Sequence, residues 1–108
     1  AVLATGFPRT FEFGSDAESA YARRMAAYRK IRMIGSAGLS LAWTAGGLFD
    51  LYLEESIFLW DVAAGMALIE GAGGTAECAS PDDAWRTSVV AGVPSLVSHE
   101  LELTPLCR

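Results

Sequence analysis

The sequence has little of the chemistry on which many metal and redox sites depend. It contains one histidine and two cysteines in 108 residues. Cys78 and Cys107 form no CxxC motif and have no histidine nearby, which argues against a zinc site or a thioredoxin-like redox pair. They are predicted to be reduced thiols, as in a cytoplasmic protein. His99 has no partner at ligand spacing and is predicted to be an exposed or packed residue of a helix.

Common nucleophile and nucleotide motifs are also missing. The chain has no GxSxG elbow, no P-loop and no GxGxxG following a strand. The glycines at 71, 73 and 74 follow a predicted helix, so a chain reversal is the favoured interpretation. Basic residues are few: eight Lys and Arg stand against thirteen Asp and Glu, for a net charge of −5. This balance argues against nucleic acid or an anionic membrane as a partner.

A long hydrophobic run is absent as well. Residues 33–49 are uncharged, but these 17 positions include four Gly, two Ser and a Thr. They are too few for a comfortable membrane span and predict a buried helix. Hydrophobic residues nevertheless make up 52% of the chain, with eleven glycines besides, whereas soluble domains average about 45–50% with glycine counted. The excess predicts that the chain hides surface against a second copy or a missing half.

Hydrophobic periodicity and turn residues predict alternating strands and helices. Ser15 with Glu18 forms a capping box, Ser36 is a second helix cap, Gly46 and Gly47 end that helix, and Pro94 opens the last one. The predicted strands are 1–7, 32–34, 48–54, 75–78 and 87–92; the predicted helices are 15–29, the segment between Ser36 and Gly46, 60–70 and 94–101. This alternation indicates a layered α/β fold in one domain spanning residues 1–108.

Within the strand at 48–54, alternation places hydrophobic and polar side chains on opposite faces. Phe49, Leu51 and Leu53 share one face, and Asp50 and Tyr52 share the other. The strand ends at Glu54, seven residues before the acid that begins the next helix.

Asp61 is the early carboxylate of an otherwise nearly apolar helix, and two interpretations of it stay open. Taken alone, a first-turn acid more often stabilises the helix dipole than binds a metal. Yet Glu54 ends a strand and Asp61 starts a helix across a short loop, so both are expected at the sheet edge where α/β folds bind ligands. Two carboxylates alone do not hold Mg²⁺, which takes an octahedron of oxygens partly from water and substrate phosphate.

The order of residues 34–74 resembles the C-terminal half of the inositol monophosphatase family. That family shares a G-[S/T]-A start, a V-A-x-G-x-x-D stretch, an acid seven residues before W-D, and W-D-x-A-x-G followed by A-G-G. Thr44 and Gly71 replace the usual Val and Glu, at positions expected to be structural. The matching elements are Gly35-Ser36-Ala37, Ala45, Gly47, Asp50, Glu54, Trp60-Asp61-Val62-Ala63-Ala64 and Ala72-Gly73-Gly74.

The resemblance implies a role for each matched site residue. Asp61 would be a ligand of the second catalytic Mg²⁺, Glu54 would hydrogen-bond a substrate hydroxyl, and the backbone at Ser36 and Ala37 would line the same pocket. The implied substrate is inositol phosphate or a similar small sugar phosphate, hydrolysed by water that the metal activates. The implied fold is a layered sandwich with a mixed sheet flanked by helices, which is the C-terminal domain of the sugar phosphatase fold.

The family's other metal ligands lie in an upstream acid and a D-P-x-D-G-T element, which this sequence lacks. We therefore expect part of a Mg²⁺-dependent phosphomonoesterase, inactive as the isolated chain, whose N-terminal half belongs to a longer polypeptide or a second chain. The alternative is a stand-alone, non-catalytic α/β domain that self-associates.

Overall fold

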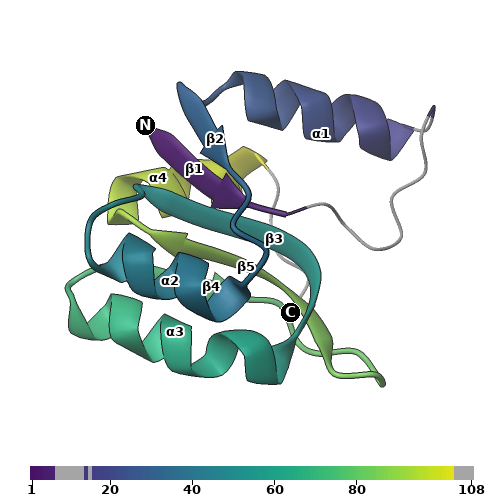
Figure 1. Cartoon of the computed structure of the whole chain (residues 1–108). Helices are drawn as coiled ribbons and strands as arrows, with labels where there is room; N and C mark the ends of the chain where they lie inside the picture. Colours follow the sequence, from purple (N-terminus) through teal and green to yellow (C-terminus); the bar gives the residue numbers. More distant parts are fainter. Residues whose placement is uncertain (7–13, 15, 104–108) are drawn as a thin grey trace.

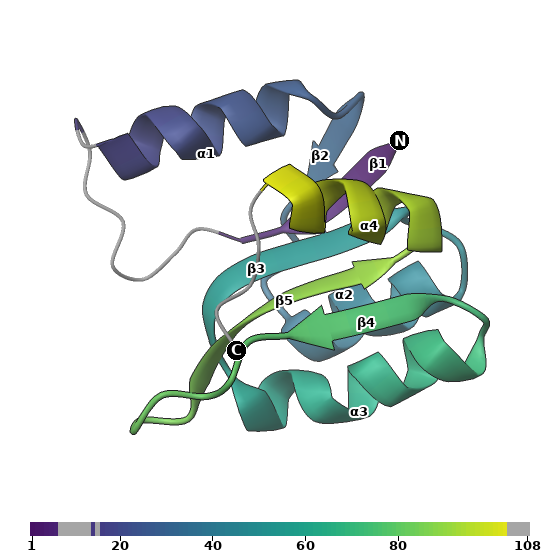
Figure 2. The ribbon, with the colours of Figure 1, turned by 180° about the vertical axis from the view of Figure 1, so that it is seen from behind.

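A five-stranded sheet lies between two layers of helices in the computed structural model, which describes residues 1–6, 14 and 16–103 (Figures 1 and 2). Helices α2 and α3 cover one face, and α1 and α4 cover the other. The strands are β1 (Val2–Thr5), β2 (Lys30–Arg32), β3 (Leu51–Phe58), β4 (Thr75–Cys78) and β5 (Arg86–Gly92); the helices are α1 (Asp16–Ala26), α2 (Ala37–Ala45), α3 (Leu59–Gly71) and α4 (Pro94–Leu103).

The sheet is mixed, with the strand order β2-β1-β3-β5-β4. Strand β1 runs parallel to both β2 and β3, whereas β5 runs antiparallel to both β3 and β4. The expected layered α/β sandwich is thus confirmed. Strand β3 is central: residues 51–53 pair with both β1 and β5, where the parallel and antiparallel portions of the sheet meet, and the part of the strand after Leu53 pairs with β5 alone.

Each face of the sheet carries its own hydrophobic core. Leu51 and Leu53 of β3 pack toward α1 and α4, while Tyr52 is fully buried toward α2 and α3. The expected division of faces is confirmed for Leu51 and Leu53 against Tyr52, whereas Phe49, which was expected beside the two leucines, packs with the Tyr52 cluster. Helices cover both faces of this sheet, and strands covered on both sides bury successive side chains instead of alternating buried with exposed.

Helices α2 and α3 pack closely because of one glycine. A Cβ built on Gly65 would lie 2.5 Å from side-chain atoms of Leu41. Such a distance is far inside van der Waals contact, so no larger residue fits at this position without movement of the two helices. The contact fixes the spacing of the two helix N-termini.

The predicted caps of α2 and the predicted start of α4 agree with the structure. The Ser36 hydroxyl accepts a hydrogen bond from the Leu39 amide at 3.2 Å, Gly46 is the C-cap of α2, and α4 begins at Pro94. The Ser15 cap lies outside the described residues. Within the described part of the chain, no helix combines the length and hydrophobicity needed to cross a bilayer.

Several element boundaries differ from the sequence-based expectation. Helix α1 ends at Ala26 rather than near 29, and β2 covers 30–32 rather than 32–34 because Lys30 pairs with Val2. Strand β3 starts at Leu51 rather than 48 and continues to Phe58 rather than ending at Glu54. The extension arises because β5 keeps pairing with β3 as far as Phe58, a long-range contact that local periodicity does not report.

Candidate functional site

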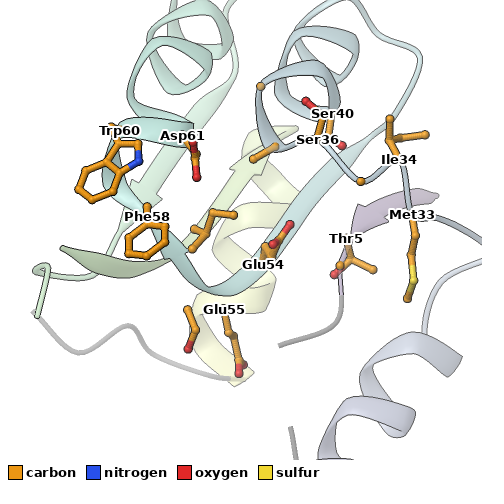
Figure 3. Close-up of a pocket in the computed structure, with 16 residues that line it drawn as sticks. Thr5, Met33, Ile34, Ser36, Ser40, Glu54, Glu55, Phe58, Trp60 and Asp61 are labelled. Atoms are coloured by element: carbon orange, nitrogen blue, oxygen red, sulfur yellow. The ribbon is translucent and has the colours of Figure 1, made fainter. Parts of the chain in front are cut away.

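A cavity of about 810 Å³, here called the acidic pocket, opens at the carboxyl-terminal ends of the parallel strands (Figure 3). Its walls come from the end of β1, the segment between β2 and α2, the second half of β3 and the starts of α2 and α3. This is the edge of an open α/β sheet where ligands bind in many proteins. The lining residues are Thr5, Gly6, Met33, Ile34, Gly35, Ser36, Ala37, Gly38, Ser40, Glu54, Glu55, Ser56, Ile57, Phe58, Trp60 and Asp61.

All four site residues expected from the sequence line this one pocket. Ser36 and Ala37 come from the start of α2, Asp61 from the first turn of α3 and Glu54 from β3. Two helix N-termini therefore meet at the same space. Because the first amides of a helix lack intrahelical partners and carry partial positive charge, this arrangement favours an anionic group in the pocket.

Asp61 is an exposed first-turn acid and not the cap of α3. The N-cap position is Phe58, which makes no side-chain capping bond. Among the described residues none donates a hydrogen bond to the Asp61 carboxylate, which Figure 3 shows on the pocket side of α3. The two interpretations of Asp61 are thus compatible, because its charge complements the helix dipole while its oxygens face the cavity.

Glu54 is half-buried and held by one neighbour on its own strand. The Tyr52 hydroxyl donates a hydrogen bond to Oε1 of Glu54 at 2.9 Å. Burial raises the pKa of Glu54 above its ordinary value, the Tyr52 hydrogen bond opposes this shift, and the charge of Asp61 adds to it. The two carboxylates therefore interact electrostatically across the pocket.

No loop separates the two acids: β3 ends at Phe58 and α3 begins at Leu59. Glu54 lies within the strand rather than at its end, so the expected strand-loop-helix arrangement is wrong. The pairing of β3 with β5 shifts register between Glu54 and Ile57, and Ser56 adopts a left-handed backbone conformation with φ of 56°. Such irregularities bend a strand and redirect its side chains, and they are frequent next to functional sites.

Three further residues that shape the pocket were missed from the sequence. The Thr5 hydroxyl donates to the Leu53 carbonyl at 2.5 Å, which fixes the end of β1 against β3. A Cβ on Gly6 would lie 3.0 Å from the Glu54 carboxyl, so the glycine leaves room for that group. The sequence could have indicated that Tyr52 lies beside Glu54, because residues two apart on a strand share a face. No sequence pattern indicates that Thr5 and Gly6 lie near Glu54.

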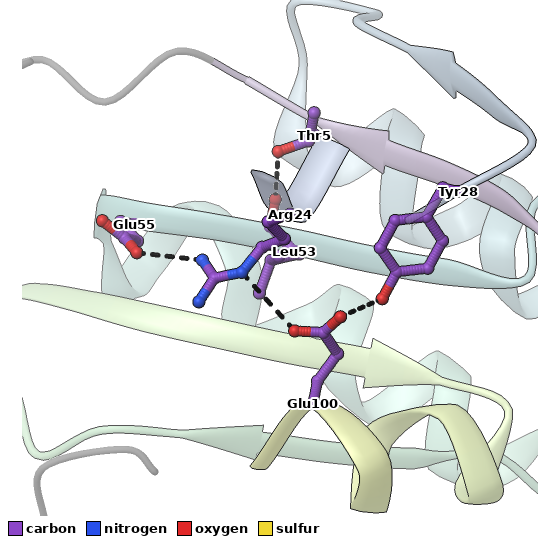
Figure 4. Close-up of polar contacts among 6 residues, drawn as sticks. All are labelled: Thr5, Arg24, Tyr28, Leu53, Glu55 and Glu100. Atoms are coloured by element: carbon purple, nitrogen blue, oxygen red, sulfur yellow. Dashed lines mark hydrogen bonds and ion pairs between the residues drawn. The ribbon is translucent and has the colours of Figure 1, made fainter. Parts of the chain in front are cut away.

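A polar network on the opposite face of β3 lies behind the pocket (Figure 4). Arg24 of α1 forms ion pairs with Glu55 at 3.2 Å and with Glu100 of α4 at 3.5 Å. The Tyr28 hydroxyl donates to the other oxygen of Glu100, a side chain that is only 3% exposed. Two helices are thereby tied to the residue next to Glu54 in the chain.

Aromatic side chains form the outer rim of the pocket. The rings of Phe58 and Trp60 stack with centroids 4.7 Å apart, and the Arg86 guanidinium lies 4.5 Å from the centre of the Phe58 ring. Arg86 also donates to the Ser56 carbonyl at 3.2 Å. The irregular part of β3 is thus held by Arg24 through Glu55 and by Arg86 through the backbone.

The donor chemistry of the pocket fits a hard cation, but the number of donors is small. Carboxylate oxygens are the ligands that Mg²⁺ prefers, and Asp61 presents them to the cavity. Within the part of the chain that the structure describes, no three acidic, histidine or cysteine side chains are gathered as a metal site would require. The described residues therefore offer carboxylate oxygens but do not make up a complete Mg²⁺ site by themselves.

A mixed α/β sandwich with a pocket at the carboxyl ends of its parallel strands belongs to the open α/β sheets, in which ligands bind at this edge. The chain belongs to the inositol monophosphatase family, whose model matches residues 7–104.

Individual relatives agree with this assignment. An inositol-1-monophosphatase from Caulobacter vibrioides is 33% identical over 104 residues, which cover 93% of this chain and 38% of that protein. A Nus factor SuhB from Xylella fastidiosa is 57% identical over 44 residues, covering 41% of this chain and 16% of that protein. The solved structure of Mycobacterium tuberculosis SuhB superposes with a TM-score of 0.77 at 31% identity, covering 94% of this chain and 40% of that one. The chain thus spans less than half the length of the relatives it matches.

Proposed function

We propose that this chain is the part of a Mg²⁺-dependent phosphomonoesterase that binds the substrate's hydroxyl groups and supplies one ligand of the second metal ion. The substrate is inositol phosphate or a similar small sugar phosphate. The observation that carries the proposal is the meeting of Glu54, Asp61 and the N-termini of α2 and α3 in one cavity. Acidic oxygens for a cation and the positive ends of helices for an anion are what a metal-assisted phosphate site needs.

The site residues have different roles in this proposal. Asp61 binds Mg²⁺, and Glu54 accepts a hydrogen bond from a hydroxyl of the substrate. The backbone at Ser36 and Ala37 lines the pocket beside the substrate. When bound, Mg²⁺ supplies charge stabilisation for the phosphate and lowers the pKa of the attacking water. The chain's own contribution is orientation, which places the ester for attack.

The remaining ligands and the phosphate-binding element are proposed to belong to an N-terminal half. By itself, the 108-residue chain is expected to release negligible phosphate and to bind Mg²⁺ only at about millimolar concentration or weaker, because one carboxylate leaves the octahedron incomplete. A tight stoichiometric site in the isolated chain, measured by calorimetry, would overturn this division of the ligands. A cytoplasmic location stays a prediction.

The proposed function is tested by phosphate release from inositol 1-phosphate with Mg²⁺, using this chain joined to the N-terminal half. Asp61→Asn keeps the size of the side chain but removes its charge, and we expect activity to fall at least about a hundredfold. The matched control is Glu70→Gln, which neutralises an exposed acid at the other end of α3. Wild-type turnover by the Asp61→Asn protein would contradict the assigned role.

A second candidate function is favoured by the outer surface of α2 and α3. Helix α2 contains no charged residue, and the exposed side chains of this layer include Leu39, Trp43 and Leu68. A patch of this kind marks an interaction surface. It is compatible with a stand-alone domain that self-associates, and equally with a surface that the N-terminal half covers.

A further inference from the structure

We propose that Tyr52 is a positioning residue that orients the Glu54 carboxylate, and thereby sets the preference of the acidic pocket for ligands that present a hydroxyl group. The proposal rests on the proposed function, since it concerns the same pocket. Tyr52 does not itself line the cavity, so its effect on a ligand passes through Glu54.

The geometry around Tyr52 leaves its hydroxyl one described acceptor. The residue is fully buried between the sheet and the layer of α2 and α3, and its ring packs with Leu41, Val62 and Val89. Its hydroxyl extends from this apolar core to Oε1 of Glu54, 2.9 Å away. A buried hydroxyl without an acceptor is costly, so the core fixes the phenol and the phenol fixes the carboxylate.

The environment of Glu54 makes such a restraint necessary. Its strand loses regular pairing immediately afterwards, between Glu54 and Ile57, so the ladder of backbone hydrogen bonds does not hold this segment evenly. Asp61 repels the carboxylate from across the pocket. Gly6 approaches on another side, where even a Cβ would meet the carboxyl group. Tyr52 is the one described residue that donates a hydrogen bond to Glu54.

The consequence for ligands follows from the two oxygens of the carboxylate. Tyr52 occupies a lone pair of Oε1, which leaves Oε2 and the remaining lone pairs to accept hydrogen bonds from the cavity. An ionised carboxylate donates none, so the ligand group beside it has to be a donor. A polyol supplies such a donor, and a phosphate ester without hydroxyl groups does not. Tyr52 therefore acts on recognition of the polyol and not on recognition of the phosphate.

The test compares Tyr52→Phe with Tyr28→Phe in the 108-residue chain joined to the N-terminal half. Both changes keep the ring and remove a tyrosine hydroxyl that donates to a glutamate, but Tyr28 serves Glu100, away from the pocket. Binding is followed by NMR titration with two probes, inositol 1-phosphate and phenyl phosphate. We expect Tyr52→Phe to weaken inositol phosphate binding by about three- to tenfold, with phenyl phosphate binding unchanged. Tyr28→Phe should leave both affinities unchanged.

Two results would overturn the proposal: equal weakening for both probes, or no weakening for either. A second readout is independent of ligand, namely the side-chain scalar couplings of Glu54, which report whether it holds one rotamer. We expect one rotamer in wild type and Tyr28→Phe, and averaging in Tyr52→Phe. If the joined wild-type protein binds neither probe, the proposed function of the pocket fails. In that case the side-chain couplings of Glu54 still test the role of Tyr52. An unchanged Glu54 rotamer in the Tyr52→Phe protein would show that Tyr52 does not orient the carboxylate.

Discussion

At the scale of single residues, Glu54 shows how a binding site costs stability. Its carboxylate is half-buried, faces the charge of Asp61 and has one described hydrogen-bond donor, Tyr52. The pKa of Glu54 is raised chiefly by burial, which means that the folded protein disfavours the charged form. A carboxylate kept in such a place lowers the free energy of unfolding, and under the proposed function it is retained because it binds a hydroxyl of the substrate.

This cost has a defined pH dependence. The unfolded chain releases the Glu54 proton near the ordinary pKa of 4.5, whereas the folded chain releases it at higher pH. Stability is therefore lost as the pH rises from about 4.5 through the raised pKa, and the loss persists at neutral pH. We expect Glu54→Gln to be more stable than wild type at pH 7 and equally stable at about pH 3, as measured by urea unfolding.

The control for this experiment is Glu102→Gln, which neutralises an exposed acid of α4. It should leave the pH dependence of stability unchanged. Equal stability of Glu54→Gln and wild type at pH 7 would contradict the physical account of the Glu54 environment.

At the scale of elements, the close packing of α2 and α3 depends on Gly65 having no side chain. We expect Gly65→Ala to destabilise the chain by about 1–3 kcal/mol, because the new methyl group would overlap Leu41. Gly71→Ala, at the last residue of the same helix, meets no atom within 4 Å. Its higher helix propensity should raise stability by up to about 1 kcal/mol. Thermal unfolding of both variants measures the difference, and equal midpoints would show that the helices adjust freely.

Local chemistry was enough to predict most of the elements. Ser36, Gly46 and Pro94 mark helix ends through interactions with their immediate neighbours, which the sequence displays directly. Glu54 and Asp61 were expected in one pocket from their spacing and from the resemblance, and the structure brings them there.

Long-range pairing accounts for what the sequence did not reveal. Strand β3 continues beyond Glu54 because β5, some thirty positions later, continues to pair with it. The Arg24–Glu100 ion pair joins residues 76 positions apart. Tyr52 is buried because a second helical layer covers the face on which alternation placed a polar side chain. None of these contacts has a local signature, since each depends on which elements become neighbours in space.

At the scale of the whole molecule, one helical layer is more apolar on its outside than a solvent-facing layer requires. Leu39 and Trp43 of α2 and Leu68 of α3 are exposed, as is Leu48 just after α2. The family match together with the short span of the chain relative to its relatives accounts for such a surface, if the rest of the longer protein covers it. A self-associating domain accounts for it equally well.

Light scattering on the isolated chain separates these two accounts. We expect the chain to self-associate through the outer surface of α2 and α3, because exposed apolar area drives association. The double variant Leu39→Gln, Leu68→Gln should shift the chain to monomer, whereas Leu103→Gln, at a more exposed position on α4, should not.

The size of the assembly decides which function is favoured. A clean dimer at micromolar concentration supports the stand-alone domain. Assemblies of no fixed size that disappear once the chain is joined to the N-terminal half support the phosphatase. A monodisperse wild-type monomer would argue against self-association.

Strand β3 leads directly into α3, and this limits which insertions and deletions the region can accept during evolution. Because no loop lies between Phe58 and Leu59, no flexible segment can accommodate an inserted or deleted residue there. One residue added between Glu54 and Asp61 would rotate every following helical position by about 100°, and would carry Asp61 off the cavity wall. The distance between these two acids along the chain is therefore constrained as well as their identities, and so is the turn at 79–85, because its Trp85 carbonyl accepts a hydrogen bond from the Leu59 amide at 2.9 Å.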